Sequence, residues 1–276
     1  MEIIELIKAV ILGMVEGLTE FAPVSSTGHM IIVDDMWLKS KDFLGKYVAN
    51  TFKVVIQLGS ILAVIVVFRA RFIDLLGLNR KNKIVAVGSS HLRLSHIIVG
   101  LLPAGVLGVL FEDTIDEYLF ATEYVLIGLV IGAILMIFAD RYSKKHPNTQ
   151  TVDQITYKQA LTVGLIQCFS LWPGFSRSGA TISGGVLVGL SHKAAADFTF
   201  IMAVPIMAGA SGISFIKNLE YFTVEALPFF IVGFISAFVF ALISIRFFLK
   251  LIDKIKLLPF AIYRIILAAV IYFVFL

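Results

Sequence analysis

Long apolar stretches separated by short polar segments dominate the hydropathy pattern of this 276-residue chain. A membrane-spanning helix needs about 20 mostly apolar residues, and six stretches of about that length occur along the sequence. They lie near residues 49–68, 96–111, 124–139, 198–216, 226–245 and 257–276. Transmembrane β-strands are shorter, about ten residues, and alternate in polarity. The pattern therefore predicts an all-α integral membrane protein.

One further apolar stretch, near the N-terminus, is interrupted by polar residues. Glu16, Glu20 and Pro23 break the run, and few apolar residues remain before Asp34. Because the remainder is too short to cross the membrane, we expect a re-entrant hairpin that breaks near residues 22–27. Irregular backbone is stable at membrane depth only where protein or a water-filled cavity surrounds it.

A second interrupted stretch repeats the first one 151 positions later. Residues 13–31, GMVEGLTEFAPVSSTGHMI, align with residues 164–182, GLIQCFSLWPGFSRSGATI. The alignment predicts a second hairpin over residues 160–190, broken at residues 173–178. Both copies read as an apolar helix, a proline-marked break and a restart rich in Ser, Thr and Gly.

Three spans follow each hairpin, which predicts one membrane domain made of two halves. The first half covers about residues 1–146 and the second about residues 147–276. Each half crosses the membrane an odd number of times, so the halves are expected to be inverted repeats. Repeats of this kind place discontinuous helices at the membrane midplane, with their ends directed at one shared site.

The charges of the loops predict the orientation. The positive-inside rule assigns basic loops to the cytoplasm, and three loops are basic: 69–93, 140–158 and 246–256. Two acidic loops, 112–123 and 217–225, then face outside, as do both termini. The lysines of a polar connection over residues 34–53 argue weakly against this orientation, although three aspartates accompany them.

Composition agrees with a membrane protein and disfavours a large soluble domain. Only 15% of the residues are charged and 59% are hydrophobic, whereas soluble domains carry about 25% charged residues. The net charge of +4 comes from scattered loop residues and gives no reason to expect a nucleic-acid partner. Membrane lipids are the expected surroundings, and the sequence leaves open whether the chain forms a homodimer.

Glu16 and Glu20 are the first candidate functional residues. They are four positions apart and therefore share one helix face. Ionisable residues inside a membrane are costly and are functional candidates by default. The pair could bind a divalent cation, because Mg²⁺ commonly uses one or two carboxylates together with substrate phosphate oxygens, or it could accept a proton. The alternative is a water-exposed helix end near the interface.

The restart of the first hairpin carries three hydroxyls and a histidine. An N-cap would account for one hydroxyl, but not for Ser25, Ser26 and Thr27 together. His29 lies about one helical turn beyond Ser26, close enough to activate it or to act as an acid or base. The alternative is a histidine with a purely structural role.

The restart of the second hairpin contains an arginine among small polar residues. The guanidinium of Arg177 can bind phosphate oxygens in a bidentate manner, and helix N-termini favour anions. The alternative, an arginine that snorkels to the interface, is disfavoured because its charge opposes the helix dipole at that position.

Two polar residues outside the breaks have weaker assignments. Gln57 lines the cavity or forms an interhelical hydrogen bond, and Arg264 lies near an interface or is paired within the bundle.

The two breaks resemble the bacterial undecaprenyl-diphosphate phosphatase family, which is linked to bacitracin resistance. That family is marked by an (E/Q)xxxE block and a PGxSRSxxT block. Glu16 and Glu20 match the first block. The second block is matched by Pro173, Gly174, Ser176, Arg177, Ser178 and Thr181. The similarity covers the whole chain, including the two halves.

The resemblance implies hydrolysis of undecaprenyl diphosphate to the monophosphate, which renews the lipid carrier for peptidoglycan synthesis. It also implies a divalent cation, Mg²⁺ or Ca²⁺, and a site that opens to the outer face of the bacterial cytoplasmic membrane. The metal identity and the prenyl-length preference stay open, and a transporter or flippase of a phosphorylated polyprenyl lipid is the alternative function.

A mechanistic hypothesis combines these residues. Ser26 attacks the terminal phosphorus, Glu20 or His29 manages the protons, and a cation on Glu16 and Glu20 neutralises charge. Arg177 and the small residues of both breaks hold the diphosphate, namely Ser25, Thr27, Gly174, Ser176, Ser178 and Thr181. Direct attack by water is the alternative.

Overall fold

The computed structural model describes residues 3–78, 91–119, 121–143, 147–217 and 224–275. About 85% of the chain is helical, and no β-strand occurs in the described part. The elements in chain order are α1 (Ile3–Thr19), α2 (Ser26–Met30), the π-helix η1 (Ile31–Leu38), α3 (Ser40–Leu44), α4 (Lys46–Val67), α5 (Arg69–Leu75), α6 (Leu94–Tyr118), α7 (Thr122–Tyr142), η3 (Val152–Gln154), α8 (Tyr157–Gln167), η4 (Cys168–Leu171), α9 (Arg177–Leu187), α10 (His192–Lys217), η6 (Val224–Ala226), α11 (Leu227–Ile255) and α12 (Leu258–Phe275).

Five segments of the described chain are long and apolar enough to cross a membrane. They are Lys46–Val67, Leu94–Phe111, Thr122–Tyr142, His192–Ser214 and Val224–Ile255. The sixth expected span corresponds to α12, whose apolar part is somewhat shorter. Large apolar side chains cover the outer faces of these helices, and so much exposed apolar surface is expected next to lipid rather than water. The prediction of an all-helical, multi-pass membrane protein is confirmed.

Glycines bring α1 into close contact with α11. A Cβ atom on Gly13 would meet the carbonyl oxygen of Gly233, and one on Gly17 would meet that of Ala237. Small residues allow membrane helices to approach this closely. Ser236 adds an interhelical hydrogen bond from its hydroxyl to the carbonyl of Val10, at 2.7 Å. These contacts fix α1, which carries the two predicted carboxylates.

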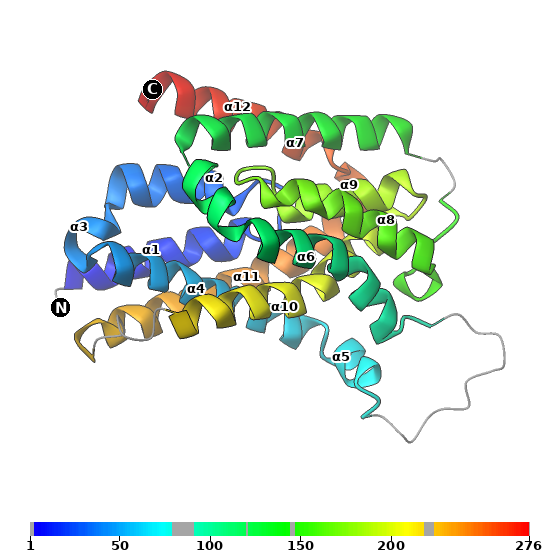
Figure 1. Cartoon of the computed structure of the whole chain (residues 1–276), viewed down its shortest axis with the longest axis horizontal. Coiled ribbons are helices and arrows are strands. Elements are labelled where there is room, and N and C mark those ends of the chain that lie inside the picture. The colour runs from blue at the N-terminus through cyan, green and yellow to red at the C-terminus, as the bar shows by residue number, and fades with distance from the viewer. Residues whose placement is uncertain (1–2, 79–90, 120, 144–146, 218–223, 276) are drawn as a thin grey trace.

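The helix that leads to the second break is held in a similar way. A Cβ atom on Gly164 of α8 would meet the backbone of Gly100 on α6. Figure 1 shows α1 extending from the end of the bundle where the N and C marks lie, and α8 on the other side of the bundle. The short helix α5 also lies away from the two termini. The two helices that precede the breaks therefore approach the centre from opposite ends.

An aspartate anchors the polar segment that precedes α8. Asp153 accepts hydrogen bonds from the guanidinium of Arg71 at 2.8 Å and from the backbone N–H of Leu92 at 3.2 Å. Partial burial by itself raises the pKa of this carboxyl, but the hydrogen bonds, with that from Arg71 the largest, outweigh it and lower the pKa below its ordinary value. The contact joins three segments at the end of the bundle where α5 lies.

The polar connection expected over residues 34–53 is largely helical in the structure. The helical segment that follows the first break continues through η1 to Leu38, and α4 begins already at Lys46. Asp34 is fully buried, accepts two hydrogen bonds from Ser40 and pairs with Lys53 at 2.8 Å. Because the carboxylate is satisfied within the protein, the helix can pass through this charged position.

Other loop boundaries also differ from those expected. Helix α6 runs to Tyr118, into the acidic segment, and α11 runs to Ile255, through most of the basic one. Charged residues can extend helices beyond the apolar layer because their side chains reach the interface. Residues 79–90, 144–146 and 218–223 of the expected loops lie outside the described residues.

Candidate active site

The two breaks share an unusual backbone conformation. Ser25 has φ 71° and Ser176 has φ 72°, a region that residues other than glycine rarely occupy. Each serine caps the helix that follows: Ser25 accepts a hydrogen bond from the N–H of Gly28 at 3.3 Å, and Ser176 accepts one from that of Gly179 at 3.2 Å. The residues that the sequence repeat pairs therefore match in conformation. Strained backbone of this kind is concentrated at functional sites.

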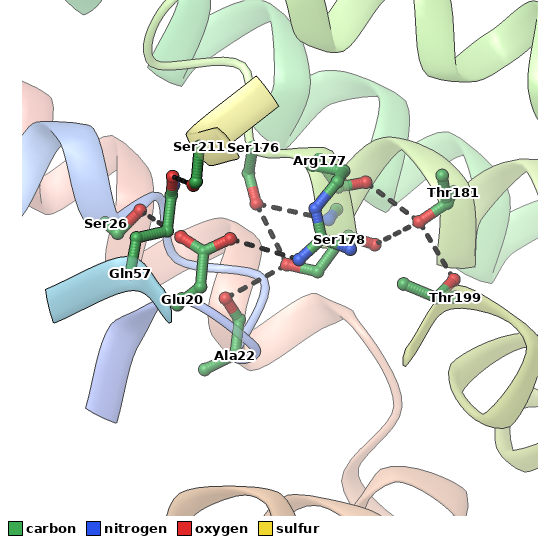
Figure 2. Close-up of polar contacts among 11 residues, drawn as sticks. Glu20, Ala22, Ser26, Gln57, Ser176, Arg177, Ser178, Thr181, Thr199 and Ser211 are labelled. Atoms are coloured by element: carbon green, nitrogen blue, oxygen red, sulfur yellow. Dashed lines mark hydrogen bonds and ion pairs between the residues drawn. The ribbon is translucent and has the colours of Figure 1, made fainter. Parts of the chain in front are cut away.

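Glu20 connects the two breaks. Its Oε1 pairs with Nη2 of Arg177 at 3.1 Å, and its Oε2 accepts a hydrogen bond from the hydroxyl of Ser26 at 2.6 Å. Figure 2 shows the carboxylate between these two partners. The side chains of Glu20 and Arg177 are only 9% and 14% exposed. A serine held by a carboxylate, next to an arginine, is an arrangement suited to nucleophilic attack on an anion.

Two hydroxyls brace the second break rather than face the cavity. The Ser178 hydroxyl donates to the carbonyl of Ala22 at 3.2 Å, across to the first break. Thr181 donates to the carbonyl of Arg177 at 2.8 Å and accepts from Thr199 at 2.8 Å. Figure 2 shows the contact of Ser178 with Ala22 and the contacts of Thr181 on either side of the arginine. They hold the backbone that presents the guanidinium.

A cavity of about 260 Å³ opens where the breaks meet. One side is polar and includes Glu20 and Arg177, whereas the other side is an apolar wall. We define this wall by the cavity-lining residues of α6 and α10, namely Ala104, Ile206, Met207 and Ala210. A cavity with one polar and one apolar side fits a ligand with a charged head and a lipid tail.

The cavity gathers most of the predicted site residues. Those that line it are Glu20, Ser25, Ser26, Thr27, Gly174, Ser176 and Arg177. Those that do not line it are Glu16, His29, Ser178 and Thr181. Their predicted roles remain predictions, but the geometry separates residues able to contact a ligand from residues behind them.

His29 is directed away from Ser26. Its Nδ1 lies 2.8 Å from the carbonyl oxygen of Ser25, and its Nε2 lies 2.7 Å from the hydroxyl of Tyr263. The two rings are also stacked, with centroids 5.6 Å apart. A neutral imidazole satisfies both contacts if Nδ1 donates and Nε2 accepts. The spacing in the sequence suggested a pair with Ser26, but the structure does not bring the two side chains together.

The carboxylates fit a divalent cation only in combination with a ligand. Glu16 is 5% exposed, and its Oε1 has no hydrogen-bond partner among the described residues. Glu20 lines the cavity, whereas Glu16 does not. No cluster of three His, Cys, Asp or Glu side chains suited to a metal occurs in the described part of the chain. Such a donor set is adequate for a cation whose remaining ligands are phosphate oxygens and water.

Arg264 is a residue whose importance the sequence did not reveal. Its side chain is completely buried, and Nη2 donates to the carbonyls of Gly174 and Phe175, at 2.8 Å each. The same nitrogen lies 3.3 Å from the carbonyl oxygen of Gly128 on α7. Arg264 forms no ion pair with any acidic side chain in the described chain. It holds the backbone of the second break two residues before Arg177.

Two glutamines also border the cavity. Gln57 accepts a hydrogen bond from the hydroxyl of Ser211 at 3.0 Å (Figure 2). Gln167 is 1% exposed, and neither polar atom of its side chain has a partner among the described residues. The only signal for Gln167 in the sequence was its alignment with Glu16 in the repeat. Without that alignment, an amide in an apolar helix is usually interpreted as a helix-packing contact.

Comparison with known proteins gives consistent matches along the chain. Residues 9–270 match the family model described as bacitracin resistance protein BacA. An undecaprenyl-diphosphatase of Geobacillus sp. (strain WCH70) is 75% identical over 275 residues, which is 100% of both chains. One of Geobacillus thermodenitrificans is 72% identical over 100% of both chains. One of Bacillus subtilis (strain 168) is 63% identical over 96% of each chain.

Proposed function

Because the chain belongs to the bacitracin resistance protein BacA family, we propose that it hydrolyses undecaprenyl diphosphate to undecaprenyl phosphate and inorganic phosphate. This activity would return the lipid carrier to cell-wall synthesis and confer resistance to bacitracin. The single structural observation that best supports it is the contact of Glu20 with both Ser26 and Arg177. Relatives of equal length that carry the name undecaprenyl-diphosphatase support the choice of substrate.

In the mechanism we favour, Ser26 is the nucleophile. Its oxygen forms a bond to the terminal phosphorus while its proton passes to Glu20 Oε2, 2.6 Å away. The bond between that phosphorus and the bridging oxygen breaks, and the lipid monophosphate leaves. A water molecule then hydrolyses the phosphoserine and releases inorganic phosphate. In the alternative, the same carboxylate deprotonates a water that attacks the phosphorus directly. Trapping of phosphoserine at position 26 would distinguish the two.

Arg177 supplies positive charge to the transferred phosphoryl group. Phosphoryl transfer depends mainly on positioning and on stabilisation of negative charge, and a guanidinium is suited to both tasks. In the described structure, Glu20 occupies one of its nitrogens at 3.1 Å. The rest of the guanidinium can bind substrate oxygens, and the small residues of both breaks, including Thr27 and Gly174, leave room for them.

A divalent cation, Mg²⁺ or Ca²⁺, is part of the proposal. Glu20, together with Glu16, would hold the cation next to the diphosphate. When bound, the cation would neutralise charge on the phosphate oxygens.

The proposed topology places the site toward the outer face of the cytoplasmic membrane. We infer that the two halves are inverted repeats with re-entrant hairpins, and the approach of α1 and α8 from opposite ends supports this (Figure 1).

In a chain whose Cys168 is replaced by serine, an impermeant thiol reagent on intact cells should label Tyr47→Cys but not Ile73→Cys. Both side chains are exposed, at 55% and 42%. The reverse pattern would invert the assigned orientation.

The proposed activity is tested with purified protein in detergent. We expect release of inorganic phosphate from undecaprenyl diphosphate, loss of this release with a chelator, and recovery when Mg²⁺ or Ca²⁺ is added back. A transporter or flippase has no function without a sealed bilayer, so phosphate release in detergent separates an enzyme from that alternative. Protein that is folded and metal-loaded but releases no phosphate would overturn the proposal.

A further inference from the structure

Gln57 and Gln167 border the apolar wall of the cavity from its two sides. Ser211, which donates to Gln57 at 3.0 Å, follows the wall residue Ala210 on α10. Gln167 lies one turn after Gly164, whose contact on α6 is Gly100. The wall residue Ala104 is in turn one helical turn after Gly100. The two amides therefore lie at the junction between the apolar wall and the polar part of the cavity.

The amides of both glutamines have unused hydrogen-bonding capacity at the cavity. The carbonyl oxygen of Gln57 accepts from Ser211, which leaves its NH₂ group as a donor next to the cavity. Gln167 lines the cavity, is 1% exposed and has no partner for either polar atom in the described chain. A buried polar group without a partner is destabilising, and such groups are rare in native proteins unless a ligand or water completes them.

Resting on the proposed function, we infer that Gln57 and Gln167 bind the phosphate group attached to the prenyl chain. The tail of the substrate must follow the apolar wall, and α6, which contributes Ala104 to this wall, also carries an apolar groove whose lining includes Ile98, Leu102, Val106 and Val109. The lipid-side phosphate then lies next to the wall, between the two amides. The terminal phosphate lies farther in, next to Ser26 and Arg177. The amides thus recognise the group that remains on the lipid after hydrolysis.

The two products of the reaction distinguish binding of the lipid-side phosphate from a general effect on phosphate binding. Undecaprenyl phosphate carries the lipid-side phosphate, whereas inorganic phosphate is the former terminal group. In full-length protein in detergent, Gln57→Ala and Gln167→Leu should each raise the inhibition constant of undecaprenyl phosphate and the KM of the diphosphate about tenfold, the effect expected for one hydrogen bond to a charged group. The inhibition constant of inorganic phosphate and kcat should change less than about twofold.

Two further variants keep the test informative if a glutamine variant folds poorly. Ser211→Ala removes the hydrogen bond that orients Gln57, and we expect a smaller change in the same direction. Ser60→Ala is the matched control: Ser60 is buried one turn beyond Gln57 on α4 and does not line the cavity. Its inhibition constants should equal those of the wild type.

The outcomes also distinguish this inference from the proposed activity. If the wild type releases no phosphate, the proposed function fails and the inference fails with it. If the wild type is active but the glutamine variants keep the wild-type inhibition by undecaprenyl phosphate, the inference alone is overturned. A larger effect on inorganic phosphate than on undecaprenyl phosphate would also overturn it.

Discussion

Replacement of Arg177 by alanine should lower kcat for phosphate release by about 10³-fold or more, the range in which arginines act on phosphoryl transfer. The guanidinium lies in a site that is largely closed to water, and its side chain is only 14% exposed. Charge that develops on the phosphoryl oxygens would find no equivalent partner there. The variant also removes the guanidinium that pairs with Glu20. The carboxylate would then be less firmly oriented toward the Ser26 hydroxyl, whose proton it accepts.

Lysine at position 177 provides the matched comparison. Arg177→Lys keeps the positive charge but loses the planar, bidentate geometry, and we expect it to recover only part of the lost rate. Arg246→Ala, at an exposed position of α11, controls for removal of a surface charge. Phosphate release should be measured on each purified variant, together with its thermal unfolding in detergent. A folded alanine variant with near-normal turnover would remove Arg177 from the mechanism.

The contact between Glu20 and Arg177 is the part of the site that the sequence predicted best. The two residues are 157 positions apart, and no local pattern relates them. The sequence repeat predicted the contact. Two similar breaks in apolar helices need hydrogen-bonding partners for their polar residues, and inside a membrane protein the two breaks can supply these partners to each other. Five of the six predicted spans were recognisable for a related reason, since a lipid environment requires long apolar helices, and the sixth corresponds to the shorter apolar helix α12.

Contacts that depend on the exact course of the backbone were not predictable. Arg264 binds carbonyl groups 89 and 90 residues away, and carbonyl groups leave no trace in the residue pattern. His29 has the spacing of a partner for Ser26, but the orientation of α2 directs it to Tyr263 instead. The polar connection expected over residues 34–53 is likewise largely helical, because Asp34 is hydrogen-bonded and ion-paired inside the protein. Such contacts cannot be recognised from the charges of the segment.

Removal of Arg264 should impair the reaction although this residue does not line the cavity. In Arg264→Met, the carbonyls of Gly174 and Phe175 lose hydrogen bonds of 2.8 Å in a fully buried place. Each carbonyl left without a partner costs about 1–3 kcal/mol. Removal of a buried charge offsets part of this cost, because its desolvation is itself unfavourable by several kcal/mol. We therefore expect only a modest fall in the unfolding temperature.

The effect on activity should be larger, because the loosened backbone carries Arg177 two residues farther on. We expect kcat to fall about 10–100-fold with little change in KM, since catalytic geometry that relaxes by about 1 Å costs rates of this order. Arg264→Lys retains a charge and a nitrogen that can donate to both carbonyls, but its shorter side chain lacks the planar guanidinium that Arg264 places there, so it should recover part of the rate. Arg246→Met is the matched surface control. Normal kcat in folded Arg264→Met would show that the second break keeps its shape without the buried guanidinium, whereas loss of both kcat and folding would reduce Arg264 to a structural residue.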